Sequence, residues 1–181
     1  MDERLTVVDP VAAAMNGILH SLPAPLWVPW PPPVGWTFAG LVHGALSDDV
    51  PSAGTAGSWS GVDPFGDPVE AVFVCEEAGT GLGGRFAGLP THYPSGDVGV
   101  GSPHAQFEVD GRTVSLWKVD GPRDRAAYVG EAKGRWLWVV LYPAEASAVM
   151  VEPLTLVDAR SLGAELAVMP LGELSPRLLM T

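Results

Sequence analysis

The most informative part of this sequence is Arg135-Trp-Leu-Trp-Val-Val-Leu-Tyr142. Successive side chains of a strand point to opposite faces, and here both faces carry apolar side chains. This pattern predicts a central strand with both faces covered. A second strand is predicted at residues 125–131, joined to the first by Lys133-Gly134, where glycine suits a tight turn. Pro143 ends the strand that begins at Arg135. This part of the chain therefore predicts a hairpin in the middle of a sheet.

Further strands are predicted on both sides of this hairpin. Residues 104–109 and 112–119 flank Asp110-Gly111, the signal of a type I′ hairpin turn. Residues 69–76 form a run of β-formers and predict a buried strand. Further strands are expected at 36–45 and 154–157, and a short one at 58–61.

Two segments carry helix signals. Asp9-Pro10, followed by spaced apolar residues, predicts an amphipathic helix to about Leu22. Asp158 is a candidate N-cap for a short helix that carries Leu162 and Leu166. With 18 prolines and 22 glycines, the chain is also rich in turns. We predict an α+β fold: a loop-rich, mainly antiparallel β-sheet with an N-terminal helix and a short C-terminal helix.

The length of 181 residues suits a single domain, residues 1–181. We expect a flexible terminus at 1–8, an extended strap rich in proline and tryptophan at 22–35, and a long Gly/Pro loop at 89–103. Six prolines in the strap argue against both helix and strand pairing. Its tryptophans, Trp27 and Trp30, either anchor the strap on the domain or present a motif to a partner.

Charge and composition exclude several classes of function. With 10 Lys and Arg against 21 Asp and Glu, the net charge of -11 argues against nucleic-acid binding. The N-terminus lacks the features of a signal peptide, and no apolar run reaches the length of a membrane span. A cytoplasmic protein without membrane association is therefore expected. Six of the ten Lys and Arg residues fall between Arg112 and Arg135. They are either solvated ends of hairpin strands or a local anion-binding site.

A glycine-rich motif, Gly79-Thr-Gly81-Leu-Gly83-Gly84-Arg85, follows the strand at 69–76. A dinucleotide site would need a long helix after it, but Pro90 leaves room for about one turn. The motif is therefore either a bend that returns Arg85 over the sheet, or a glycine nest that holds an anion. The candidate ligand-binding residues are Gly81, Gly83, Arg85, His92, Arg123 and Arg125.

The remaining reactive residues show no catalytic pattern. Cys75 lies within an apolar strand, where a thiol behaves as a small hydrophobe. The four histidines match no metal-binding motif, and no serine nucleophile motif is present. We expect no cofactor and no metal, and we lean against an enzyme. Trp136 and Trp138 are expected in the core, whereas Trp27, Trp30, Trp36, Trp59 and Trp117 are either core or lining of a pocket or interface.

Four segments resemble an uncharacterised actinobacterial family, a domain of unknown function: residues 26–36, 75–88, 124–138 and 172–178. Some members carry the label phosphotransacetylase, but those enzymes resemble larger two-domain α/β proteins, and this chain lacks their length and strand-helix alternation. Members often begin with a cysteine-rich zinc ribbon. This sequence starts without one, so it is either a short relative or a chain from which the ribbon was removed.

Two functions follow as hypotheses. The first is a non-catalytic binding or adaptor module that recognises a protein partner or a small ligand through the strap and the Gly/Pro loop. The second is a small-molecule enzyme or sensor with an anion pocket near Gly79 to Arg85. Homodimerisation through the tryptophan-rich sheet is a third hypothesis.

Overall fold

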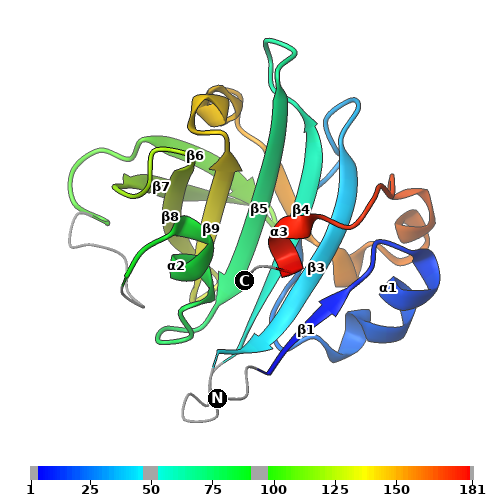
Figure 1. The fold of residues 1–181 in the computed structure, drawn as a ribbon. Coiled ribbons are helices and arrows are strands. Elements are labelled where there is room, and N and C mark those ends of the chain that lie inside the picture. The colour runs from blue at the N-terminus through cyan, green and yellow to red at the C-terminus, as the bar shows by residue number, and fades with distance from the viewer. Residues whose placement is uncertain (1–3, 47–52, 91–97, 180–181) are drawn as a thin grey trace.

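The computed structural model describes residues 4–46, 53–90 and 98–179. Within them, one ten-stranded sheet dominates the molecule (Figure 1). Its strands are β1 (Arg4–Val8), β2 (Trp27–Pro29), β3 (Thr37–Ala45), β4 (Gly54–Val62), β5 (Pro68–Glu76), β6 (Ala105–Val109), β7 (Arg112–Val119), β8 (Ala126–Ala132), β9 (Arg135–Tyr142) and β10 (Thr155–Asp158). The helices are α1 (Ala12–Ile18), α2 (Leu82–Ala87) and α3 (Pro176–Leu179), with 3-10 helices η1 (Leu19–Ser21), η2 (Ala144–Met150), η3 (Ala159–Ser161) and η4 (Gly163–Val168).

The strands lie in the order β1-β3-β4-β5-β9-β8-β7-β6-β10-β2. β10 runs parallel to β6, and the other neighbours are antiparallel. Both predicted hairpin turns are confirmed, because positive φ angles occur at Asp110 (52°) and Gly111 (81°), and at Lys133 (52°) and Gly134 (77°). These are the angles of a type I′ turn. β9 is a central strand, as predicted, and its neighbours are β5 and β8.

The predicted fold class is wrong. The protein is not an α+β domain with a mainly antiparallel sheet and helices at its two ends, but a largely β protein built on a mixed sheet. The helix expected to reach Leu22 is the seven-residue α1, whose N-cap, Val11, makes no side-chain capping bond. Leu162 and Leu166 belong to a region of 3-10 turns. The local helix signals mark segments that form only short helices, so they do not add a helical layer to the fold.

Two segments expected to lie outside the sheet are part of it. Where a flexible terminus was expected, Arg4–Val8 forms β1, paired with β3. In the proline-rich strap, Trp27–Pro29 forms β2 and pairs with β10, so the exclusion of strand pairing from this strap was wrong. The pairing is compatible with proline because β2 is an edge strand only three residues long.

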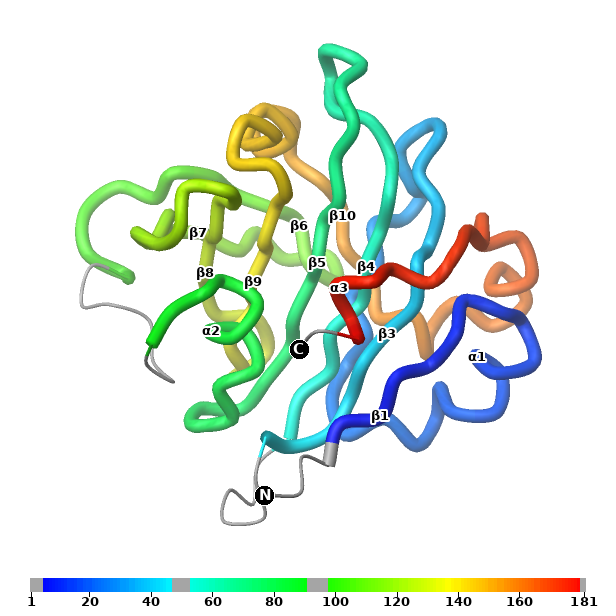
Figure 2. The backbone as a smooth tube through the Cα atoms, viewed as in Figure 1, coloured from blue at the N-terminus to red at the C-terminus, as the bar shows by residue number. Residues whose placement is uncertain are grey.

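The sheet folds over on itself. β2 stands last in the strand order and yet contacts β4 and β5, and Figure 2 shows β6 and β10 behind these strands. The enclosed face holds the larger core, which includes Trp27, Trp59 and Phe73. The outer face carries a second core, covered by α2 and α3, which includes Trp138, Leu82 and Leu178 (Figure 1). No helix among the described residues has the length and hydropathy to cross a membrane.

Candidate functional site

The glycine-rich turn after β5 folds around the buried carboxylate of Glu76. Gly81 is the N-cap of α2, with a φ of 82° that favours glycine. Glu76 Oε2 accepts a hydrogen bond from the amide of Gly83 at 3.1 Å, and Glu76 Oε1 accepts one from Trp138 Nε1 at 3.0 Å. The turn therefore already binds a carboxylate of its own chain.

Gly83 is also needed for packing. A Cβ at this position would lie 2.1 Å from Cδ1 of Trp138, so the bare backbone lets α2 sit on the indole. Burial raises the pKa of Glu76 to about 7, although the amides of Gly83 and Leu82 and the Trp138 indole act in the opposite direction. This arrangement locks α2 to β5 and β9.

The other candidate ligand-binding residues do not converge on this turn. Arg125 lies at the opposite end of α2, where Nη1 donates to the carbonyl of Phe86 at 2.7 Å. It also makes two bonds to Asp124, at 2.9 and 3.0 Å. Arg85 is half-buried on α2 and Arg123 is exposed before β8. His92 lies outside the described residues.

A group of polar side chains ties the C-terminal segment to β5. Glu70 accepts hydrogen bonds from Ser58 Oγ at 2.8 Å, from Ser175 Oγ, and from Arg177 Nε at 2.6 Å. The Arg177 guanidinium lies 3.7 Å from the ring centroid of Tyr142. The Glu70 carboxylate therefore connects β4 and β5 with the start of α3, in an arrangement that suits fixing a chain segment.

The two tryptophans proposed for partner binding are both packed on the protein. Trp27 is 1% exposed and belongs to the larger core. Trp30 is partly buried against the same core. This is the arrangement of an anchored strap, and it leaves Trp27 without a surface to offer a partner.

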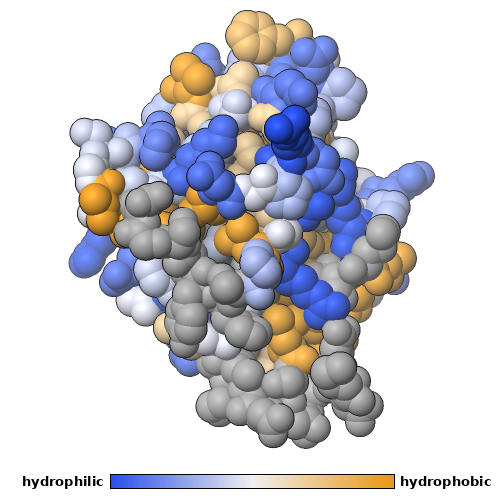
Figure 3. Space-filling view, turned by 60° about the vertical axis from the view of Figure 1, so that its left-hand side comes forward, coloured by the Kyte–Doolittle hydropathy of each residue, from blue (hydrophilic) through white to orange (hydrophobic). Residues whose placement is uncertain are grey.

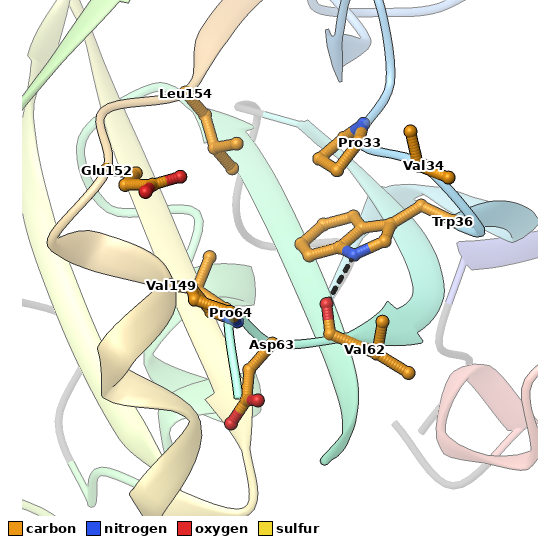
Figure 4. Close-up of a pocket in the computed structure, with 9 residues that line it drawn as sticks. All are labelled: Pro33, Val34, Trp36, Val62, Asp63, Pro64, Val149, Glu152 and Leu154. Carbon is orange, nitrogen blue, oxygen red and sulfur yellow. Dashed lines mark hydrogen bonds between the residues drawn. The ribbon is translucent and has the colours of Figure 1, made fainter. Parts of the chain in front are cut away.

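The next tryptophan along the chain, Trp36, does line a pocket (Figure 4). Its indole Nε1 donates to the carbonyl of Val62 at 2.8 Å, which fixes the ring against the end of β4. The pocket has a volume of about 190 Å³ and is mostly apolar. Its lining comes from the end of the strap, the β4–β5 turn, and η2 with the segment after it: Pro33, Val34, Trp36, Val62, Asp63, Pro64, Val149, Glu152 and Leu154.

Exposed apolar side chains line this pocket or lie next to its lining residues in the chain. Val34 is 95% exposed and Val62 44%, and both line it. Phe65, 80% exposed, follows the lining residue Pro64, and Val151, 79% exposed, precedes Glu152. Asp63 shapes the turn that presents Phe65, because its Oδ1 accepts hydrogen bonds from the amides of Phe65 at 2.8 Å and Asp67 at 3.0 Å.

Sequence reasoning found part of this pocket. Trp36 is one of the tryptophans that the sequence marks as core or as lining of a pocket or interface, whereas Val34, Phe65 and Val151 are not among the residues singled out from the sequence. A signal for Phe65 exists in Asp63-Pro64-Phe65-Gly66, since an aromatic residue in such a turn has little chance of reaching the core. Val34, between Pro33 and Gly35, sits in a similar context.

Comparisons with other proteins give a family but no activity. Among the described residues, no group of three His, Cys, Asp or Glu side chains could hold a metal ion. Neither the curated proteins nor the solved structures contain a match to this chain. The model of a family of unknown function, DUF6758, matches residues 4–178, and the chain therefore belongs to that family.

Proposed function

We propose that this protein is a non-catalytic binding module that docks a segment of a partner protein in the pocket around Trp36. The segment it fits presents an apolar side chain next to lysine or arginine. The observation that carries the proposal is this pocket with exposed Val34 and Val62 in its lining, and with exposed Phe65 and Val151 next to lining residues in the chain.

These exposed apolar side chains argue for a partner. Folded proteins seldom leave large apolar side chains grouped in water, and such groups mark interaction sites. Figure 3 shows apolar residues, with hydrophilic residues among them, at the upper end of the molecule, the end at which β4 and β5 turn in Figure 1. An apolar side chain entering the pocket would meet the Trp36 ring and leave the exposed apolar residues to pack around it.

The charges argue for a basic partner. The charged residues among the described lining are Asp63 and Glu152, both acidic. The whole chain carries a net charge of -11, which favours encounter with a positively charged surface. Lysine or arginine beside the apolar anchor would therefore meet the exposed carboxylate of Glu152, whereas the carboxylate of Asp63 is buried and held by the turn.

A small anionic ligand at the glycine-rich loop is less favoured. The amide of Gly83 is bonded to Glu76, and Arg125 is bonded to Asp124 and Phe86. An incoming anion would have to displace the chain's own carboxylates.

Selection of random peptides displayed on phage against the full chain tests the proposal. Enriched peptides should share an apolar residue beside lysine or arginine. Synthetic versions should bind several-fold more weakly to Val34→Ser and Phe65→Ser, which remove apolar surface, and to Glu152→Lys, which reverses a charge. Val168→Ser is the matched control, since Val168 is 73% exposed and does not line this pocket. Failure to enrich such peptides, or equal binding to all variants, would overturn the proposal.

A further inference from the structure

We propose that a second pocket, at the place where β7 leaves β8, binds a small organic cation, with a quaternary ammonium group as the best fit. This pocket is separate from the one around Trp36, and the inference does not rest on the docking function.

The pocket arises from a change of partner along β7. Residues Trp117–Val119 pair with β8, whereas Arg112–Leu116 pair with β6. The two strands approach closely at the branch, because a Cβ on Gly130 would lie 2.1 Å from the carbonyl oxygen of Ser115. Glycine therefore permits a branch that a side chain would block. The hollow beside it has a volume of about 390 Å³, within the usual range of ligand sites, about 300–1,000 Å³.

Two indoles and a carboxylate line this hollow together. Trp117 pairs with Val129 across β7 and β8, and Glu131 pairs with Trp136 across β8 and β9. Because side chains two residues apart along a strand share a face, Trp117, Glu131 and Trp136 all project from the outer face of the sheet. Both tryptophans are partly exposed, and all three residues line the pocket.

A hydrogen bond from the indole N–H holds Trp117 in place. Its indole Nε1 lies 3.4 Å from the carbonyl oxygen of Gly101, a long hydrogen bond that orients the ring. Trp136 packs on the second core with part of its surface free. The two rings are therefore supported by the fold before any ligand arrives, which lowers the entropy cost of binding.

The chemistry of the lining selects a cation. Glu131 is the one charged residue in the described lining, which contains no lysine, arginine or histidine. Indole faces attract cations, and a carboxylate adds a Coulombic attraction while it repels anions. A quaternary ammonium group has no N–H donors that would need acceptors, so a lining rich in aromatic surface suits it.

Isothermal titration calorimetry on the full chain tests the site. Tetramethylammonium chloride and choline should bind with similar affinity, whereas dimethylbutanol, the neutral carbon isostere of choline, should bind roughly tenfold more weakly or not at all. Betaine should bind more weakly than choline, because its carboxylate approaches Glu131. Equal binding of choline and its neutral isostere, or no binding of any cation at millimolar concentrations, would overturn the proposal.

Variants locate the binding. Glu131→Gln should weaken choline binding roughly tenfold, and Trp117→Leu should weaken it by a similar factor. Glu108→Gln is the control, because Glu108 is an exposed strand carboxylate outside the pocket lining. Choline affinity unchanged in both Glu131→Gln and Trp117→Leu would overturn the assignment to this pocket, provided that both variants retain the unfolding midpoint of the wild type.

Discussion

Gly61 lies directly against the indole of Trp36: a Cβ on Gly61 would come within 2.1 Å of Trp36 Cδ1. The ring cannot easily retreat, because its Nε1 donates a hydrogen bond to the carbonyl of Val62 and the Trp36 side chain is itself buried. Glycine at position 61 is therefore what allows the tryptophan to form one wall of the docking pocket.

Gly61→Ala should destabilise the protein by about 1–3 kcal/mol through overpacking and should weaken the binding of docking peptides. Urea unfolding followed by tryptophan fluorescence measures the first effect. Gly17→Ala is the control, since a Cβ there has no neighbour within 4 Å and alanine favours the helix. A Gly61→Ala variant as stable as Gly17→Ala would show that Trp36 has room to move.

Glu76 should make stability depend on pH. Because burial raises its pKa in the folded protein to about 7, the folded state holds this proton more tightly than the unfolded state. The stabilisation of the folded state by this proton is fully present below the ordinary pKa of a glutamate. It is lost as the pH rises through about 7. The loss amounts to roughly 3 kcal/mol.

Glu76→Gln should flatten this dependence. The difference in unfolding free energy between wild type and variant should therefore change between pH 4.5 and pH 8, which urea titrations at several pH values would measure. Glu77→Gln, at the exposed neighbouring position, should keep the wild-type profile. An unchanged profile in Glu76→Gln would contradict the raised pKa.

Glu70→Gln should loosen the C-terminal segment. The substitution removes the negative charge that faces Arg177 and leaves the hydroxyls of Ser58 and Ser175 with a poorer acceptor. A loss of about 1–3 kcal/mol is expected. Hydrogen exchange should quicken at the amides of Gly172 and Ser175, which bond to Phe38 and Ala39 of β3. Glu173→Gln, an exposed neighbour, should leave these exchange rates unchanged.

Cys75 should be unreactive in the folded protein. It is 1% exposed, and burial raises the pKa of its thiol to about 12, so the nucleophilic thiolate is scarce at neutral pH. An aromatic disulfide reagent should therefore label Cys75 only at the rate of unfolding and should label it rapidly in denaturant. Fast labelling without denaturant would contradict this burial.

The parts of the fold that could be predicted are those encoded by neighbouring residues. Asp110-Gly111 and Lys133-Gly134 specify their turns through backbone angles, and β9 is specified by its alternating apolar faces. The pairing of β2 with β10 joins segments more than a hundred residues apart, and no local pattern reports it. The parallel contact between β6 and β10 was missed for the same reason.

The candidate site also has a part that the sequence indicates and a part that only the three-dimensional structure reveals. Trp36 and Trp117 could be suspected of lining pockets because large aromatic residues are informative wherever they lie. Whether a given tryptophan is covered depends on distant strands: Trp27 and Trp59 are buried by the fold of the sheet, whereas Trp117 is left partly open by the branch in β7. The glycine motif was recognised, but its ligand, Glu76, could be identified only from three-dimensional contacts.

The proline-rich strap also bears on aggregation. β2 is one terminal strand of the sheet, and it ends at Pro29, with Pro31, Pro32 and Pro33 following. Proline has no N–H to donate, so this border is a poor template for the strand of another molecule. Of the two terminal strands of the described sheet, β1 is therefore the better starting point for growth into a fibril or for strand exchange between copies.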